Sequence, residues 1–454
     1  MGGWGMSSEV AEHRLESICL LVVDCPHATP KWTDSGVVVL RNQNIKGGRL
    51  DLSSPSYTDE EHYLGRVKRA VPQAGDIVIT REAPMGDVCQ IPAGLKCCLG
   101  QRQVLLRPDP KKVDSRFLLY ALQSPYIQHQ IGWNEGTGST VSNLRIPVLE
   151  ALSVPTPELA VQREVAETLG AIDDRITLLR ETNTTLEAIA QALFKSWFVD
   201  FDPVYAKMQG RSPEGMVEAT AALFPDSFEK SELGDVPKGW KLVPIGQLLS
   251  HTIGGDWGSD VVDEKNDTRV AIIRGTDIPD LQSNANSRVP VRYTSQKKLA
   301  GRKLEDGDLL LEVSGGSKDQ PTGRSLFISA TLLSQFDCPV EPASFCRLLR
   351  PVNKDFGMLL AQHLTYIYAQ GKTWEYQNQS TGIANFQTTH FLETELVACP
   401  PDDVLKVFAE TVQPLIARAH LTQIQELASL RDVLLPRLVT GQLSINKKNE
   451  QGPE

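Results

Sequence analysis

The chain has 454 residues, which is too long for a single hydrophobic core, so two or three domains are expected. With 41% hydrophobic and 22% charged residues it has the composition of an ordinary globular protein, which excludes a disordered or fibrous chain. The net charge of −10 argues against a free-standing, tight DNA-binding protein. Residues 1–157, however, hold 16 basic and 16 acidic residues, and residues 240–400 hold 16 and 18. Each of these two parts is nearly neutral and could present a local basic face.

The sequence also limits the compartment. The longest apolar stretch, Ile18 to Val23, is far too short for a membrane helix, and the N-terminus lacks the layout of a secretory signal. None of the eight cysteines forms a Cys-x-x-Cys pair, so no zinc site or redox motif is evident. We therefore expect reduced thiols, a cytoplasmic protein and no bound metal.

The chain contains an internal repeat. Five short motifs of the first half return in the second half in the same order, at offsets of about 232 to 243 residues. One such match would be noise, but five in register indicate a duplicated unit. The matched pairs are Trp4 with Trp240, Val38–Ile45 with Ala271–Ile278, Ala74–Ile79 with Asp306–Leu311, Val104–Pro108 with Arg347–Pro351, and Gly138–Leu144 with Ser380–Phe386.

Each copy is predicted to mix strands and helices. Short β-branched runs such as Val37–Leu40 and Ile77–Thr80 are bounded by turn-forming residues, which is typical of strands. Helices are expected at Ser115–Gln130 and Asp355–Ala369. The expected fold class is therefore α+β, with two duplicated globular domains.

A long helix is expected after each copy. The first carries an uninterrupted heptad seam with Asn183 as its one polar position, and a buried Asn weakens packing but specifies register. At 1.5 Å per residue this helix would extend roughly 60 Å, which exceeds the width of a domain. Pairing with a second helix is therefore favoured over an ordinary core helix. The seam consists of Val165, Leu169, Ile172, Ile176, Leu179, Asn183, Leu186, Ala190, Leu193 and Trp197.

The second helix has a less regular seam, which slips between Ala419 and Ile424 and is interrupted by Arg431. We still expect the two helices to pair as an antiparallel coiled coil, which would relate the two globular parts by a pseudo-two-fold axis. The residues expected to pair are Leu179, Asn183, Leu186, Leu193, Leu427 and Leu434.

These patterns predict the domain organisation. The expected parts are a first globular domain at 1–157, a long helix at 158–200, a linker at 201–238, a second globular domain at 239–400, a distal long helix at 401–441 and a tail at 442–454.

No catalytic motif is visible. The sequence lacks a phosphate-binding Gly-x-x-x-x-Gly-Lys-Ser/Thr loop, a dinucleotide-binding Gly-x-Gly-x-x-Gly fingerprint and the Asn/Asp-Pro-Pro-aromatic motif of amino-methyltransferases. Metalloprotease and nucleophile-elbow motifs are missing as well. Neighbouring acids such as Asp173 and Asp174 are typical of solvated surfaces. We therefore assign no catalytic residue.

Four segments of the sequence, Leu186–Val204, Leu430–Gly441, Pro237–Trp240 and Thr80–Gly86, resemble segments of one known family. This family is the specificity subunits of type I restriction–modification enzymes. Residues Leu186–Val204 resemble their central region, and Leu430–Gly441 resemble their distal region. Residues Pro237–Trp240 resemble the start of their second target recognition domain, and Thr80–Gly86 resemble a segment common in the first. The resemblance covers essentially the whole chain. It departs locally where Glu312–Gly316 replaces the Arg81 segment in the second copy.

The resemblance implies a non-catalytic, DNA-binding subunit. Each target recognition domain would read one half of a split, asymmetric site in double-stranded DNA. The helices would set the gap between the halves and dock two methyltransferase subunits. Restriction/translocase subunits would complete the complex. The partner subunits would bind S-adenosylmethionine, ATP and Mg, so no cofactor is expected in this chain.

Candidate DNA contacts lie on loops rich in donors and acceptors, where Arg suits guanine and Asn or Gln suits adenine. The matched Arg41 and Arg274 would hold phosphate. The residues expected to contact DNA are Arg41, Arg81, Ser139, Thr140 and Asn143 in the first copy, and Arg274, Ser314, Ser317, Lys318, Gln379 and Asn385 in the second. The alternative for each is an exposed or turn-capping loop residue. A basic cluster from Lys297 to Lys303 is either a phosphate clamp or a solvated face.

Two other functions fit the sequence less well. A self-contained restriction–methylation enzyme would need cofactor or nuclease motifs, which the sequence lacks. A coiled-coil adaptor without DNA contact would not need two duplicated α+β domains. The sequence-specific DNA-binding subunit is therefore the favoured interpretation.

Overall fold

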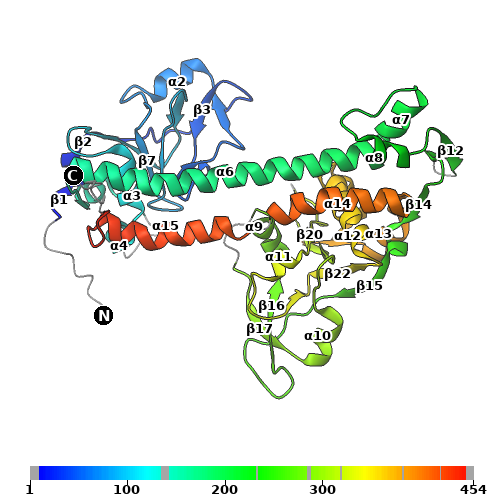
Figure 1. Ribbon diagram of the computed structural model, residues 1–454. Helices are drawn as coiled ribbons and strands as arrows, with labels where there is room; N and C mark the ends of the chain where they lie inside the picture. The colour runs from blue at the N-terminus through cyan, green and yellow to red at the C-terminus, as the bar shows by residue number, and fades with distance from the viewer. Residues whose placement is uncertain are drawn as a thin grey trace, which may run out of the picture. The chain divides into compact units, whose positions relative to one another are not determined.

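The computed structural model describes residues 10–133, 143–231, 234–283, 288–316, 320–380, 383–419 and 421–445. The chain divides into two compact units, which can be followed by colour in Figure 1. Unit 1 comprises residues 1–176 and 427–454, and unit 2 comprises residues 177–426. Both units combine small sheets with helices, which confirms the expected α+β class. No helix in the described ranges combines the length and the apolar character needed to cross a membrane.

Unit 1 is built on a four-stranded antiparallel sheet and a three-stranded sheet. The four-stranded order is β2 (Cys19–Asp24), β10 (Gln103–Pro108), β7 (Ile77–Thr80) and β8 (Val88–Gln90). The three-stranded order is β6 (Ser56–Thr58), β3 (Val37–Leu40) and β9 (Cys97–Leu99), with β3 and β9 parallel. Shorter pairs join β1 (Glu12–Arg14) to β11 (Ser153–Pro155) and β4 (Ile45–Lys46) to β5 (Arg49–Leu50). The helices are α1 (Leu15–Ile18), α2 (Glu60–Arg66), α3 (Ser115–Gln123), α4 (Pro125–Trp133) and α5 (Ile146–Glu150), with a 3-10 turn η1 (Asn42–Asn44).

Unit 2 repeats the four-stranded sheet, the three-stranded sheet and the β1–β11 pair of unit 1 in the same order, which confirms the duplication. Its four-stranded order is β15 (Leu249–Gly254), β22 (Cys346–Pro351), β18 (Leu309–Glu312) and β20 (Ser325–Phe327). Its three-stranded order is β17 (Val291–Thr294), β16 (Thr268–Ile273) and β21 (Val340–Pro342), again with a parallel pair. The pair β14 (Lys241–Pro244) and β25 (Leu396–Cys399) matches β1 and β11. A further sheet joins β19 (Ser314–Gly315), β24 (Ile383–Phe386) and β23 (Gln377–Ser380).

The helices of unit 2 pack on these sheets. They are α9 (Ile278–Gln282), α10 (Gln296–Arg302), α11 (Ala330–Leu333), α12 (Lys354–Ala369) and α13 (Thr388–Thr394), with 3-10 turns η2 (Ile245–Leu248), η3 (Gly275–Asp277) and η4 (Lys372–Tyr376). The segment predicted as a linker contains α7 (Asp202–Met208), α8 (Glu218–Leu223) and the hairpin β12 (Phe228–Ser231) to β13 (Gly234–Pro237). Trp197 and Phe198 are buried in this region, packed against protein as expected.

Two predicted helices are broken. The helix expected at Ser115–Gln130 is two helices, because Ser124 adopts an extended backbone before Pro125. The distal helix expected at 401–441 is α14 (Asp402–Ala419) followed by α15 (Gln423–Val439). The seam of the predicted distal helix slips at this break. The new helix begins where the Thr422 hydroxyl donates to the Glu426 side chain and the Glu426 amide donates to the Thr422 carbonyl.

The long helix α6 (Leu159–Phe198) has 40 residues, and its first part packs antiparallel to α15 within unit 1. The Asp173 carboxylate binds Arg431 at 2.9 Å. Leu169, earlier in α6, shares a core cluster with Leu438, later in α15. Arg431, which interrupts the seam in sequence, is therefore an ion-pairing position in the structure.

The second part of α6 packs antiparallel to α14 within unit 2. The rings of Phe198 and Phe408 lie 4.7 Å apart, centroid to centroid. Leu179, earlier in α6, lines one small cavity with Ile424, at the start of α15. Of the predicted pairing residues, Leu179 is buried, and the half-buried ones are Asn183, Leu186, Leu193, Leu427 and Leu434.

A buried ion pair stands at the same place in both four-stranded sheets. In unit 1, Arg107 binds Asp76 through two hydrogen bonds of 2.8 and 2.7 Å. In unit 2, Arg350 binds Asp308 through two of 2.8 Å. Both carboxylates are 3% exposed. The repeated Gly-Asp and Arg-Pro motifs therefore encode one structural contact used twice.

This contact predicts a large loss of stability when its arginine is removed. Arg107→Ala leaves the buried Asp76 charge without its partner, which costs about 3–5 kcal/mol of unfolding free energy. Arg350→Ala should have the same effect on unit 2. Arg14→Ala, which breaks an exposed pair with Glu16, is the control and should cost far less. Urea unfolding measures all three, and equal losses for Arg107→Ala and Arg14→Ala would contradict the role of the buried pair.

A second prediction concerns Glu341 on β21. Its side chain is fully buried, and neither carboxylate oxygen has a hydrogen-bond partner among the described residues. Unit 1 has Cys98 at the equivalent register position. Burial, with a contribution from Asp256, raises the pKa of Glu341 to about 7. Because the folded state holds this proton more tightly than the unfolded chain, stability should fall as pH rises from about 4.5 to 7.

Glu341→Gln removes the titrating group and keeps the side-chain shape. Its melting temperature should exceed that of the wild-type chain at pH 8, and the gain should shrink towards pH 5. Thermal unfolding across this range gives the difference curve. A difference that does not change with pH would show that Glu341 does not titrate in the folded protein.

Candidate nucleic-acid interface

In both units, the chain that leaves the third strand of the four-stranded sheet is tied to the end of a Gly/Ser/Thr loop. In unit 1, the Leu144 amide donates to the Arg81 carbonyl at 2.9 Å, directly after β7. In unit 2, the Phe386 amide donates to the Val313 carbonyl at 2.9 Å, directly after β18. The described ends of the two repeated segments, at Leu144 and Phe386, are therefore tied to equivalent points of the two sheets.

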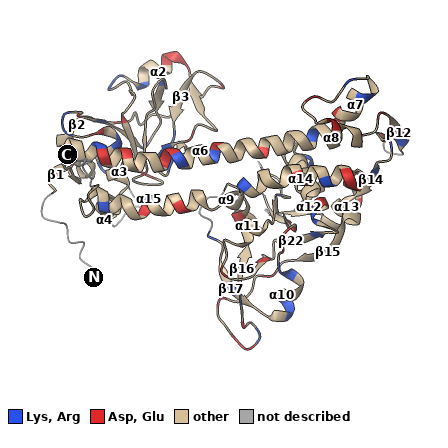
Figure 2. Ribbon diagram, in the orientation of Figure 1, with Lys and Arg blue, Asp and Glu red and all other residues tan. Residues whose placement is uncertain are grey.

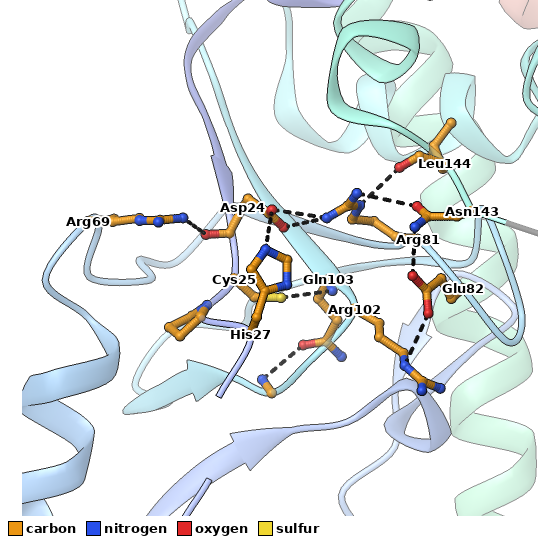
Figure 3. A network of polar contacts seen from close by, with 12 residues as sticks. Asp24, Cys25, His27, Arg69, Arg81, Glu82, Arg102, Gln103, Asn143 and Leu144 are labelled. Carbon is orange, nitrogen blue, oxygen red and sulfur yellow. Dashed lines mark hydrogen bonds and ion pairs between the residues drawn. The ribbon is translucent and has the colours of Figure 1, made fainter. Parts of the chain in front are cut away.

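Arg81 is the centre of a polar network in unit 1, which Figure 3 shows. Its guanidinium binds both carboxylate oxygens of Asp24 at 2.9 Å and donates to the Leu144 carbonyl at 2.9 Å. It also donates to the Asn143 amide oxygen at 3.3 Å. The Arg81 side chain is only 12% exposed. The structure therefore places this predicted DNA ligand in the wall of the site, where it holds the loop end.

Glu82 extends the same network towards solvent. Its carboxylate accepts from the Asn143 amide at 2.7 Å and pairs with Arg102 at 3.2 Å. Its carbonyl accepts from the Asn42 amide at 2.5 Å. The Arg102 side chain is 58% exposed, so this guanidinium is accessible beside the loop. The network brings Arg81 and Asn143 together and connects them to the turn that follows Arg41.

In unit 2, the equivalent contact joins two predicted residues. Ser314 and Asn385 are paired across β19 and β24, and the Ser314 hydroxyl donates to the Asn385 amide oxygen at 3.1 Å. Asn385 is exposed, whereas Ser314 is half-buried. Gln379 lies in β23, where its backbone pairs with Ala384. The structure thus brings Ser314, Gln379 and Asn385 onto one small sheet.

The arginine network of unit 1 is replaced in unit 2 by a glutamate. Glu312, at the position of Thr80, is buried and binds Arg324 through hydrogen bonds of 2.8 and 2.6 Å. Glu312 also lies close to Gly275 and Gly315, where an added Cβ would come within 2.5 and 2.7 Å of its oxygen. Both glycines therefore allow the backbone to approach this ion pair. The two four-stranded sheets match in strand order, but the charged residues beside their third strands differ.

The matched residues Arg41 and Arg274 start equivalent turns but have different surroundings. The Arg274 guanidinium binds Asp277 at 2.9 and 2.7 Å and is held within its own turn. In unit 1, the neutral Asn44 occupies the place of Asp277, and Arg41 is exposed. The Arg41 guanidinium forms no ion pair with a described residue and lies over the Trp32 ring instead.

Four predicted residues lie outside the described residues, namely Ser139, Thr140, Ser317 and Lys318. The basic cluster on α10 is described, and Figure 2 shows its Lys and Arg residues there. Lys298 pairs with Asp256 at 2.8 Å, and Arg302 donates to the Gly254 carbonyl. Lys297 remains an exposed cation on this helix. Across the described ranges, no group of three or more His, Cys, Asp or Glu side chains could hold a metal ion.

Sequence reasoning missed the partners that organise the site. Asp24 is 57 residues from Arg81, and Arg324 is 12 residues from Glu312. Neither pair has a local spacing signal. The pair of Arg274 and Asp277 did have a local spacing signal, because an Arg and an acidic residue three positions apart can pair across a turn.

The polar network predicts that Arg81 stabilises the position of the chain at Leu144 even when no ligand is bound. Arg81→Ala should speed amide hydrogen exchange at Leu144 and the residues after it, because the loop end loses its side-chain anchors. Arg81→Lys keeps the charge but loses the two-pronged contact with Asp24, so it should give an intermediate effect. Hydrogen-exchange mass spectrometry on the full chain without DNA makes the comparison. Unchanged exchange in Arg81→Ala would mean that Arg81 does not hold the loop.

Comparisons with known proteins agree on one family. A family model described as a type I restriction modification DNA specificity domain matches residues 27–188. The type I restriction enzyme MjaIX specificity subunit of Methanocaldococcus jannaschii is 25% identical over 387 residues, which cover 82% of this chain and 78% of that protein. The putative MjaX specificity subunit of the same organism is 34% identical over 288 residues, which cover 61% of this chain and 60% of that protein.

One solved structure has a similar fold. The crystal structure of a type I restriction–modification S subunit from M. genitalium aligns with 96% of this chain and 98% of its own, with a TM-score of 0.51 and 14% identity. This likeness shows a shared fold. In sequence, the chain resembles specificity subunits of type I restriction–modification systems over the ranges given above.

Proposed function

We propose that this chain reads DNA for a type I restriction–modification enzyme, with each unit reading one half of a split, asymmetric site. The observation that carries this proposal is the duplicated frame with unlike residues at equivalent points. Asn143 contacts Glu82 in unit 1, and Asn385 contacts Ser314 in unit 2. Equivalent scaffolds with different polar edges are what two readers of different sequences require.

The network in unit 1 supports readout by a preorganised side chain. The Asn143 amide group donates to Glu82 and accepts from Arg81, so its orientation is set before any ligand arrives. Arg102 offers exposed donors beside it, and Arg is the side chain best suited to guanine. The neighbouring loop carries Ser139 and Thr140, which stay in the proposal as predicted contacts.

In unit 2, the exposed Asn385 amide and the Ser314 hydroxyl are the corresponding groups, with Gln379 on the adjacent strand. Asn suits adenine and a hydroxyl suits several base edges, so this half should have a different preference from the first. Ser317 and Lys318, in the loop after β19, remain predicted contacts as well.

We further propose that α6 sets the gap between the two half-sites and that the paired helices dock two methyltransferase subunits. A helix of 40 residues extends about 60 Å at 1.5 Å per residue. In this proposal the restriction/translocase subunits complete the complex. The partner subunits, rather than this chain, bind S-adenosylmethionine, ATP and Mg.

The experiment that tests the function is methylome sequencing of a host that expresses this chain with a matching methyltransferase partner. The expected result is a new adenine-methylated motif made of two unlike specific parts separated by unspecified bases. A continuous or palindromic motif would contradict the two-reader proposal. Methyl transfer by the purified chain without partners would contradict its role as a non-catalytic subunit.

The ruler role generates a separate prediction. Four residues inserted after Leu179 lengthen α6 by at most about 6 Å, and B-DNA rises about 3.4 Å per base pair. The gap between half-sites should therefore grow by one or two base pairs, with both half-site sequences unchanged. Two inserted residues rotate the downstream seam by roughly 200° and should abolish assembly. An unchanged gap in an active four-residue variant would mean that another element sets the spacing.

A further inference from the structure

Each unit exposes one tryptophan whose ring is covered by an arginine. In unit 1, the Arg41 guanidinium carbon lies 5.4 Å from the Trp32 ring centroid. In unit 2, the Arg292 guanidinium carbon lies 4.7 Å from the Trp257 ring centroid. The two tryptophans are 46% and 40% exposed. Trp133 and Trp374 are exposed as well, but among the described residues only Trp32 and Trp257 have a guanidinium over the ring.

The two tryptophans occupy the same edge of the duplicated fold. Trp32 directly precedes Thr33, which bridges to Tyr57 of β6, the outer strand of the three-stranded sheet in unit 1. Trp257 lies two residues before Ser259, which bridges to Tyr293 of the equivalent outer strand β17. Trp32 and Trp257 therefore correspond in their position in the topology as well as in residue type.

In each unit, the residue before the tryptophan forms an ion pair with a residue of a neighbouring helix. The positive and negative partners are exchanged between the two units. Lys31, before Trp32, pairs at 3.5 Å with Asp59, the N-cap of α2. Asp256, before Trp257, pairs at 2.8 Å with Lys298 on α10. Helices α2 and α10 follow equivalent strands in the two copies. Each Trp segment is thus joined by an ion pair to the same helix of the repeat.

The surroundings of Trp32 connect it to the candidate interface of unit 1. Arg41 covers its ring, and the Arg41 side chain also donates weakly to the Ser56 hydroxyl at 3.5 Å. The next residue, Asn42, donates to the Glu82 carbonyl, and the Glu82 carboxylate accepts from Asn143. The Trp32–Arg41 pair is therefore linked through Asn42 and Glu82 to Asn143, which is proposed to read bases.

In unit 2, Arg292 lies on β17 and pairs in register with Val270 of β16. Its Nη2 binds Asp260 at 3.0 Å, a carboxylate whose side chain is 79% exposed. The Arg292 side chain is 17% exposed, so only part of its guanidinium is open to a further anion. Lys298 of α10 pairs with Asp256, the residue before Trp257, at 2.8 Å.

These groups match the chemistry of a nucleic-acid backbone. A guanidinium binds phosphate oxygens, and an indole ring packs on the apolar face of a sugar. Neither indole N–H has a hydrogen-bond partner among the described residues, so both remain available as donors. Because the same pair occurs in two units whose other polar residues differ, its ligand should be a feature common to both half-sites. The sugar–phosphate backbone of duplex DNA is such a feature.

We propose that Trp32 with Arg41, and Trp257 with Arg292, are anchors that hold the backbone of duplex DNA against each unit without reading its sequence. The tryptophans occupy equivalent places, whereas Arg41 follows β3 and Arg292 lies on β17. This inference rests on the proposed DNA-reading function. It assigns affinity to the Trp–Arg pairs and specificity to the loops that end at Asn143 and Asn385.

The test measures binding by the chain assembled with its methyltransferase subunits. Two duplexes are used, one carrying the methylated motif and one with that motif scrambled, and fluorescence anisotropy is recorded at several salt concentrations. Trp32→Ala and Trp257→Ala should each weaken binding to both duplexes by a similar factor, about tenfold. Arg41→Gln should also lower the slope of log affinity against log salt by about one. The methylated motif should stay the same in every variant.

The controls separate an anchor from a folding effect. Trp32→Phe keeps an aromatic ring under Arg41 and should retain most of the affinity. Leu20→Ala removes another exposed apolar side chain of unit 1, 61% exposed on β2, and should not change binding. Melting temperatures close to the wild-type value in all these variants would exclude unfolding.

The outcomes are distinguishable. Wild-type affinity in Trp32→Ala and Trp257→Ala would overturn the inference while leaving the proposed function intact. A changed methylated motif would also overturn it, because the tryptophans would then read bases. If the wild-type assembly bound neither duplex, the proposed function itself would fail, and this inference with it.

Discussion

One main-chain hydrogen bond, made twice, determines where this protein can present polar groups. The amide of Leu144 donates to Arg81, and the amide of Phe386 donates to Val313. Each bond closes a loop onto the residue that leaves the third strand of a four-stranded sheet. The side chains before the bond, Asn143 and Asn385, are thereby set against the residues after that strand. Everything proposed about recognition depends on this closure, because a free loop could not hold its donors and acceptors in one arrangement.

The two units stabilise this closure with different chemistry. Unit 1 uses the Arg81 guanidinium, which joins Asp24 on β2 to the end of the loop. Unit 2 uses the buried pair of Glu312 and Arg324, with glycines that let the backbone approach it. The sheets beneath are the same in strand order and share the Asp–Arg contact between neighbouring strands. The two units therefore share a sheet frame but differ in the polar residues next to it.

The repeat made much of the fold predictable. The runs Val37–Leu40 and Ile77–Thr80 are strands with those bounds, and the helix expected from Asp355 begins one residue earlier. The breaks at Ser124 and after Ala419 depend on a local Pro and on a seam slip whose outcome the pattern left open. The polar partners of the site were less accessible to prediction, because they come together only through the sheet topology. Arg81 illustrates this, since its partner Asp24 belongs to a strand far away in sequence.

The central claim is that one chain contains two independent readers of DNA sequence. The most direct measurement is the methylated motif of a chimera in which residues 240–400 are replaced by the equivalent segment of a related specificity subunit. The account predicts that only one half of the motif changes, while the other half and the gap between the halves are retained. A motif in which both halves change together would contradict it.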